Sequence, residues 1–174
     1  MKNYLVLLMI ISCFAVLISG CISSEETSKH YEADGLSFNY SDSWVKADVQ
    51  YPSNTTQSKI LINLADPSDP ETGFSVQKHP LLTGNSLDNN IETVIESYEN
   101  SGYKIISKNQ SSISGESAYE LLFTVDKGST HIKQREYWCK HNDSLYTVAF
   151  FSTPQNFDKS QNAFNIIMQS FKFT

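Results

Sequence analysis

The chain has 174 residues and a formal net charge of −6 at pH 7. Aromatic residues make up 12% of it and charged residues 18%, a balance that excludes an intrinsically disordered chain. The acidic excess excludes wholesale binding to nucleic-acid phosphates, because no surplus of basic residues exists to displace counterions. The length predicts one domain, or a domain with an appendage.

Residues 1–20 have the pattern of an export leader. Lys2 precedes an apolar run from Tyr4 to Ile18, shorter than the about 20 residues that a membrane-spanning helix needs. Ile18-Ser19-Gly20-Cys21 then resembles the lipobox of prokaryotic lipoproteins, whose cysteine becomes the lipidated N-terminus. An uncleaved anchor helix is the alternative, but a polar segment starts directly after Cys21, which favours cleavage.

Cleavage there defines three segments. We expect a signal peptide over 1–20, a lipidated flexible tether over 21–33 and a folded domain over 34–174. Acyl chains contribute about 0.8 kcal/mol per buried methylene, so two of them would hold the protein durably on a membrane. The sequence thus predicts an extracytoplasmic domain on the outer face of the cytoplasmic membrane. Cys139 is then without a partner for an intrachain disulfide.

The domain begins with strand patterns. Leu36, Phe38 and Tyr40 alternate on one face of a strand. The sequence pattern predicts two more strands, at 59–65 and 74–78, joined by a proline-containing turn.

The periodicity becomes helical between residues 86 and 100. Its apolar residues lie on one helical face: Leu87, Ile91, Val94, Ile95 and Tyr98. Ser86 is the predicted N-cap, and Gly102 is the predicted stop. Four further strands are predicted, at 103–107, 118–125, 131–140 and 144–151, followed by a helix from Pro154 to Ser170. Runs of strands between two helices indicate an α+β fold with a largely antiparallel sheet flanked by helices.

Two stretches carry a resemblance to a known family. The segment from Gly35 to Trp44 resembles the first strand and turn of PsbP-like domains, and the end of the chain, up to Phe173, resembles their closing strand and helix. Ser41 departs from the pattern, because such domains usually have proline before the tryptophan turn. The resemblance implies an antiparallel sheet sandwiched between helices, and a prokaryotic, most nearly an archaeal, PsbP-related lipoprotein.

The family covers unlike functions: an extrinsic subunit of photosystem II, a nuclear Ran-GTPase binder and many prokaryotic lipoproteins. The resemblance therefore implies the fold more strongly than the function. No motif in this chain justifies a transfer of the photosynthetic manganese or calcium role, so we expect no cofactor.

Three groups of residues are candidate sites of catalysis, metal binding or docking. Cys139 and His141 are two apart on a predicted strand, which places thiol and imidazole on one face. Cysteine–histidine enzymes usually bring these residues together from distant segments, so we expect Cys139 to act as a small core residue. Asp66, Asp69 and Glu71 offer oxygens to calcium, but their spacing is that of an acidic turn, and we expect no metal site.

His131, Lys133 and Arg135 alternate along one strand and form a basic stripe on an acidic protein. One hypothesis is a docking surface for an anionic partner or headgroup. The alternative is a solvated sheet face. Ile132 and Trp138 lie on the opposite face of the same strand.

An exported chain also offers its asparagine sequons to glycosylation. Four occur, at Asn39, Asn54, Asn109 and Asn142. Asn54 and Asn142 are predicted to be accessible, whereas Asn39 lies inside a strand.

No convergent set of catalytic residues is found. The leading hypothesis is a lipid-anchored, non-enzymatic module that binds or assembles with a protein partner of the cell envelope. The second is a receptor for a small ligand or a metal, with a pocket between the sheet and a helix lined by Tyr and Trp. A thiol enzyme using Cys139 is the third.

Overall fold

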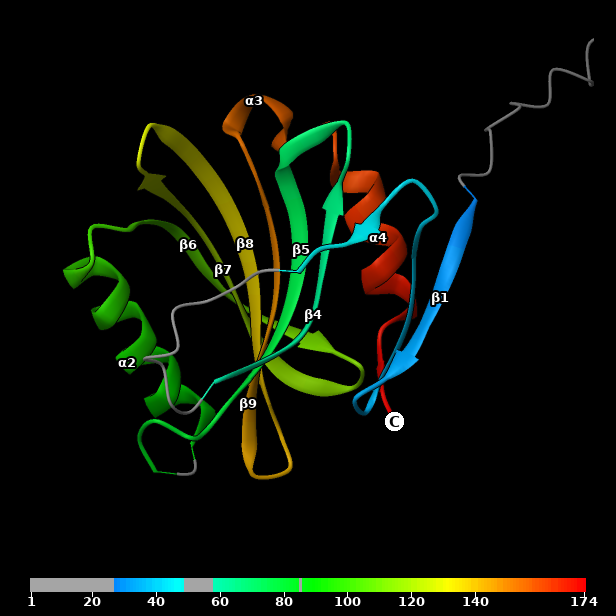
Figure 1. The fold of residues 1–174 in the computed structure, drawn as a ribbon. Coiled ribbons are helices and arrows are strands. Elements are labelled where there is room, and N and C mark those ends of the chain that lie inside the picture. The colour runs from blue at the N-terminus through cyan, green and yellow to red at the C-terminus, as the bar shows by residue number, and fades with distance from the viewer. Residues whose placement is uncertain (1–26, 49–57, 85) are drawn as a thin grey trace, which may run out of the picture.

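The computed structural model describes residues 27–48, 58–84 and 86–174, and Figure 1 shows their fold. These residues form ten strands and three helices. Their bounds are β1 Ser28–Ala33, β2 Leu36–Ser41, β3 Val45–Lys46, β4 Lys59–Asp66, β5 Asp69–His79, α2 Leu87–Asn100, β6 Lys104–Ile113, β7 Glu116–Lys127, β8 Thr130–His141, β9 Ser144–Ser152, α3 Pro154–Phe157, α4 Gln161–Ser170 and β10 Lys172–Phe173.

Seven strands form an antiparallel sheet in the order β3-β4-β5-β9-β8-β7-β6. Short turns connect β6 to β9 as a meander, and the β8–β9 turn places Asn142 at φ 53°. Strand β5 then pairs with β9 rather than with β6, because α2 carries the chain from one side of the sheet to the other. The predicted α+β fold with a largely antiparallel sheet is confirmed.

A smaller sheet, in the order β1-β2-β10, lies beside the large one. Its first strand occupies residues 28–33, which the sequence analysis assigned to the tether, so the folded domain begins earlier than residue 34. Tyr31 anchors this strand: it is buried, and its ring stacks 5.0 Å from that of Phe38. A single large aromatic residue in a polar segment carries no periodicity, and for that reason the strand was missed.

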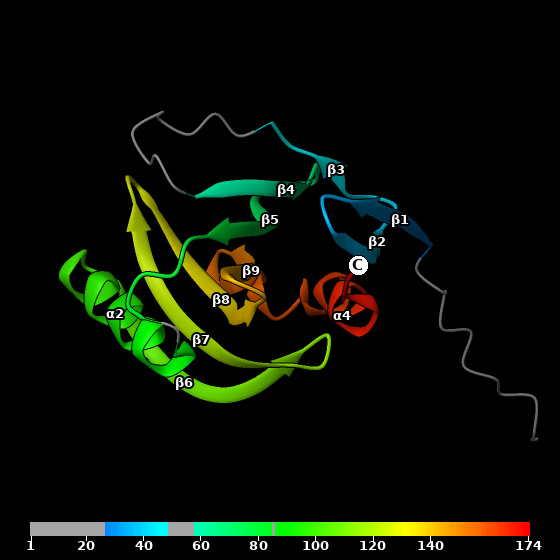
Figure 2. The same cartoon turned by 90° about the horizontal axis from the view of Figure 1, so that it is seen from below.

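The two faces of the large sheet carry separate cores (Figure 2). On one face, α4 and the small sheet pack over aromatic residues, and the ring of Phe164 stacks 5.1 Å from that of Phe150. On the other face, α2 buries Ile91 and Val94 against β7 and β8. The predicted C-terminal helix is divided in two, because a turn at 158–160 separates α3 from α4. None of the helices in the described ranges is long and apolar enough to cross a membrane.

Candidate functional site

Helix α2 covers only part of its face of the sheet. It contacts β6 and β8, and Figures 1 and 2 show it at the β6–β8 side of the molecule. Residues that are directly paired on neighbouring strands have their side chains on the same face of a sheet. Successive pairs therefore define this face across β4, β5, β9, β8 and β7: Asn63, Ser75, Ala149, Glu136 and Leu121. Away from α2 many side chains on this face are small or polar, such as Ser75 and Ala149. Among the described residues, no helix covers this part of the sheet.

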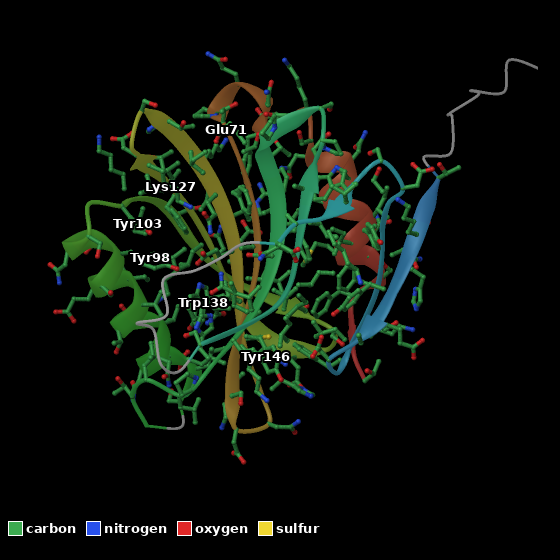
Figure 3. All side chains as sticks on the ribbon, viewed as in Figure 1. Glu71, Tyr98, Tyr103, Lys127, Trp138 and Tyr146 are labelled. Carbon is green, nitrogen blue, oxygen red and sulfur yellow. The ribbon has the colours of Figure 1, made fainter. Side chains whose placement is uncertain are left out.

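A cavity of about 460 Å³ occupies this open region. We call it the Glu136 cavity. Its lining comes from β4, β5, β7, β8, β9, the end of α2 and the segments next to them: Ala47, Asn63, Leu64, Ala65, Pro70, Thr72, Ser75, Gln77, Tyr98, Tyr103, Lys127, Gln134, Glu136 and Phe151. Figure 3 shows Tyr98, Tyr103 and Lys127 between α2 and β8.

Glu136 lies in the wall of this cavity and is only 4% exposed. Three neutral groups donate hydrogen bonds to its carboxylate. The Trp138 indole nitrogen and the Tyr98 hydroxyl reach Oε2 at 2.6 and 2.8 Å, and the Gln134 amide reaches Oε1 at 2.7 Å. The side chain is therefore held in one position by donors from both the sheet and α2.

The environment shifts the ionisation of these groups. Burial raises the pKa of Glu136 above its usual range, although the hydrogen bonds from Trp138, Tyr98 and Gln134 oppose that rise. Burial, together with the charge of Glu136, raises the pKa of Tyr98 well above 10.0. Tyr98 thus remains a hydroxyl donor at neutral pH.

Aromatic rings form one wall. The rings of Tyr98 and Tyr103 are stacked with centroids 4.7 Å apart, and both contact Phe123 beneath them. Lys127 and Phe151 also line the cavity, and the Nζ atom of Lys127 lies 5.8 Å from the centroid of the Phe151 ring. The cavity consequently combines aromatic surface with a buried carboxylate and one lysine.

Gly73 permits Phe151 to take its place in this wall. The two residues are directly paired between β5 and β9. A Cβ atom on Gly73 would come within 2.6 Å of Cζ of Phe151 and 2.8 Å of the carbonyl oxygen of Leu64. A glycine is required because the ring covers this point of the strand.

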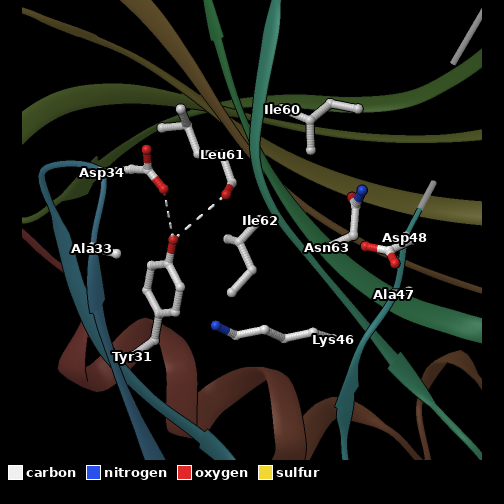
Figure 4. Close-up of a pocket in the computed structure, with 10 residues that line it drawn as sticks. All are labelled: Tyr31, Ala33, Asp34, Lys46, Ala47, Asp48, Ile60, Leu61, Ile62 and Asn63. Carbon is white, nitrogen blue, oxygen red and sulfur yellow. Dashed lines mark hydrogen bonds between the residues drawn. The ribbon is translucent and has the colours of Figure 1, made fainter. Parts of the chain in front are cut away.

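A second, wider groove of about 630 Å³ lies between β1 and β4 (Figure 4). Its Asp34 carboxylate is already paired. The Tyr31 hydroxyl donates to Asp34 at 3.1 Å, and Nζ of Lys59 lies 3.1 Å from the other oxygen of that carboxylate. Because the Asp34 carboxylate is exposed and already paired, whereas Glu136 is buried in the wall of its cavity, the Glu136 cavity is the stronger candidate site.

Comparison with known proteins identifies the fold. The model of the PsbP-like protein family matches residues 20–173. The chain belongs to this PsbP-like family. The predicted resemblance is therefore confirmed over most of the sequence. No curated protein is significantly similar to the chain in sequence.

Solved structures share the fold of this PsbP-like chain at low identity. Cyanobacterial PsbP (CyanoP) from Synechocystis sp. PCC 6803 has a TM-score of 0.62 and 15% identity, and the match covers 86% of this chain and 94% of that one. LpqN of Mycobacterium tuberculosis, described as involved in cell envelope biogenesis, has a TM-score of 0.54 and 15% identity, with 85% and 90% covered.

Cys139 and His141 point to the same face of β8, away from the Glu136 cavity. The Cys139 thiol is fully buried, and burial raises its pKa to about 12. The His141 ring pairs with Glu116 at 3.0 Å and stacks 4.2 Å from Phe173. A thiol of this kind is almost entirely protonated at neutral pH, so the site offers no thiolate nucleophile.

The basic stripe lies on that face as well. Arg135 donates a 2.5 Å hydrogen bond to Gln161 of α4, and Nζ of Lys133 lies 4.4 Å from the centroid of the Phe157 ring of α3. Only about a quarter of each of these two side chains is exposed, whereas His131 is half exposed beside Asp126. The docking hypothesis for the stripe stays a prediction, and His131 is its most exposed member.

Two carboxylates of the acidic turn, those of Asp66 and Asp69, accept hydrogen bonds from nearby residues, and Glu71 is exposed. Oδ1 of Asp66 accepts hydrogen bonds from the amide and hydroxyl of Ser68, and Asp69 accepts from Thr72 and Asn156. Within the described part of the chain no group of three metal-ligating side chains occurs.

The structure describes three of the five predicted modification sites, and these three differ in exposure. Asn109 lies exposed on β6, Asn142 lies exposed in the β8–β9 turn, and Asn39 is half-buried in β2 beside His30. Cys21 and Asn54 lie outside the described residues.

Sequence analysis missed Glu136, Gln134 and Tyr98 as site residues. A signal was present, because alternation along β8 places Gln134 and Glu136 between Ile132 and Trp138 on the apolar face. A charged residue at an inward position marks a functional or a hydrogen-bonded group.

Proposed function

We propose that this PsbP-like chain is a lipid-anchored, extracytoplasmic binding domain of the cell envelope that performs no catalysis itself. The Glu136 cavity is its binding site. The anchor rests on the lipobox-like motif that ends at Cys21. The envelope location is supported by that motif and by the shared fold with LpqN, a protein involved in cell envelope biogenesis.

The cavity is the observation that carries the binding role. Ligand sites are concave, contain aromatic surface and present a few polar groups that fix orientation. All three features meet where α2 ends, over the polar part of the sheet. This arrangement favours the small-ligand hypothesis, with Tyr98 and Tyr103 as its aromatic wall.

The anchor is tested by membrane fractionation of the full-length chain expressed in a prokaryotic host. Wild-type protein is expected in the membrane fraction, with a mass that corresponds to a diacylated N-terminal Cys21. Cys21→Ala is expected to lose both the lipid mass and the membrane association. Cys13→Ala lies inside the leader and is the matched control, with no change expected. Membrane association of Cys21→Ala equal to that of wild type would contradict the anchor.

The binding role is tested by native mass spectrometry of protein purified from its own membranes. A small-molecule mass increment, and a rise in melting temperature when the released molecule is added back, are expected. Ser75→Leu, which projects an isobutyl group into the cavity, should abolish both signals. Ser112→Leu, at an exposed position of β6, should keep them. Identical binding by both variants would place the ligand elsewhere.

A further inference from the structure

We propose that the Glu136 cavity binds a small organic cation, a protonated amine whose ammonium group pairs with the carboxylate of Glu136. This inference rests on the proposed function, because it names the ligand class of the same site.

The carboxylate of Glu136 accepts three hydrogen bonds and has one lone-pair position free to accept another. A carboxylate has about four lone-pair positions. Trp138 and Tyr98 fill two on Oε2, and Gln134 fills one on Oε1. The Trp138 indole can only donate, so Oε2 has to accept. The remaining position, on Oε1, suits an N–H donor from a ligand in the cavity.

Within the described ranges, the carboxylate of Glu136 has no counter-ion at contact distance. Among the described residues, no lysine, arginine or histidine nitrogen lies within 4.0 Å of Glu136. His79 stacks on Trp138 but is neutral, because burial lowers its pKa to about 4. Lys127 is exposed at the cavity and acts on Glu136 from beyond hydrogen-bond distance. Buried charges are normally paired, and a bound cation would supply the missing partner.

The rest of the lining suits an organic cation. The stacked rings of Tyr98 and Tyr103 and the ring of Phe151 present aromatic surface, which attracts an ammonium group as well as a hydrocarbon chain. Ser75 and Gln77 on β5 add neutral polar groups. A volume of about 460 Å³ fits a small molecule.

Two other ligand classes fit less well. A free anion would be repelled by the negative charge of Glu136. Calcium requires six to eight oxygen ligands, whereas the cavity offers one carboxylate that already accepts three hydrogen bonds. A single ammonium group needs only one such oxygen and an aromatic neighbour.

The test compares amines with neutral molecules of the same shape. The mature lipidated protein in a non-ionic detergent is titrated with phenethylammonium and 1,5-diaminopentane. Their neutral counterparts are 2-phenylethanol and 1,5-pentanediol. Phenylacetate and Ca²⁺ are the anion and metal probes. Affinity is measured by calorimetry, and the NMR resonance of the Trp138 indole N–H reports binding at the site itself.

Each amine is expected to bind about tenfold or more tightly than its alcohol. Glu136→Gln should remove this preference and leave the affinity for the alcohols within about twofold. This variant is a close structural match, because its amide oxygen still accepts from Trp138 and Tyr98. A cooperative melting transition and a dispersed amide NMR spectrum would confirm that its fold is retained. Lys127→Gln is the control for the second charge, and its amine affinity should be equal or higher.

Equal affinity for amines and alcohols, or an amine preference that survives in Glu136→Gln, would overturn the inference. Tightest binding by phenylacetate or by Ca²⁺ would also overturn it while leaving a binding cavity in place. The proposed function itself would fail only if no probe, and no small molecule from the native membranes, shifted the indole resonance of Trp138.

Discussion

The hydroxyl of Tyr98, on α2, donates a 2.8 Å hydrogen bond to Oε2 of Glu136, on β8. The two residues are 38 positions apart in the chain, so this bond connects the end of the helix to the centre of the large sheet. The same oxygen also accepts from Trp138. The position of α2 and the orientation of the buried carboxylate therefore depend on each other.

Tyr98→Phe should destabilise the domain, because it removes a donor from a buried carboxylate and changes nothing else. A hydrogen bond to a charged group contributes about 1.5–3 kcal/mol, and we expect a loss of that order in the free energy of unfolding, measured with urea. Tyr119→Phe is the matched control: its hydroxyl donates to the exposed Asp88 at 2.6 Å, and a much smaller loss is expected. Equal losses in the two variants would contradict a special role for Glu136.

The main features of the fold could be predicted because strands and helices leave periodic patterns. Tyr119, Leu121, Phe123 and Val125 alternate on β7, and the structure places them on one face with α2. Strand β1 could not be predicted from periodicity, because only Tyr31 among its six residues is buried. What orders β1 is its pairing with β2, a contact that no local pattern encodes.

The free energy of unfolding should depend on pH through Glu136. Burial raises its folded pKa above the unfolded value, so the folded state holds this proton more tightly. The contribution is fully present below the unfolded pKa, about 4.3, and is lost as the pH rises through the folded pKa. Wild type should therefore lose stability relative to Glu136→Gln as the pH rises from about 4 through the folded pKa of Glu136.

Urea unfolding of both proteins across this range measures the difference. Asp69→Asn is a control of opposite sign, because hydrogen bonds from Thr72 and Asn156 lower the pKa of Asp69. Stability that depends on Asp69 is present above its unfolded pKa and is lost as the pH falls through the folded one. A wild-type to Glu136→Gln difference that stays constant with pH would show that Glu136 has an ordinary pKa.

Gly73→Ala should destabilise the domain and disturb the cavity, because the added methyl group meets the ring of Phe151 and the carbonyl of Leu64. Overpacking of this kind costs about 1–3 kcal/mol. Gly128→Ala is the control for backbone strain alone. Gly128 has φ +62°, and no atom lies within 4 Å of the new Cβ atom, so this variant introduces no overpacking. Thermal melting reports stability for both, and loss of ligand binding is expected for Gly73→Ala alone.

The candidate site was only partly accessible from sequence. A pocket between the sheet and a helix, lined by Tyr and Trp, was the second hypothesis. The structure lines the cavity with Tyr98 and Tyr103, whereas Trp138 contributes a hydrogen bond to Glu136 in its wall. The buried carboxylate in its wall was missed. Alternation along β8 places Glu136 on the face of Ile132 and Trp138, but its position beside a cavity depends on the pairing of β8 with β9 and on the end of α2. The role of the small residues Gly73 and Ala149 could not be predicted either, because it depends on the pairing of β5 with β9.

Asn90→Ala should destabilise the start of α2. The sequence predicted Ser86 as N-cap, and Ser86 does take that position, but its side chain makes no capping hydrogen bond. Asn90, one turn later and 1% exposed, bonds the preceding loop instead. Its Oδ1 accepts from the amides of Leu82 and Thr83, and its Nδ2 donates to the carbonyl of Ser86 at 2.6 Å. Loss of this side chain removes the acceptor of the Leu82 and Thr83 amides, whereas the carbonyl of Ser86 still accepts from the backbone amide of residue 90.

A cost of about 2–3 kcal/mol in the free energy of unfolding is expected for Asn90→Ala. Asn89→Ala is the matched control, since Asn89 is an exposed neighbour in the same helical turn and should cost less than about 0.5 kcal/mol. Hydrogen exchange gives the local readout: the amides of Leu82 and Thr83 should lose protection in Asn90→Ala and keep it in Asn89→Ala. Protection that persists in Asn90→Ala would mean that packing of α2, rather than this side chain, holds the loop in place.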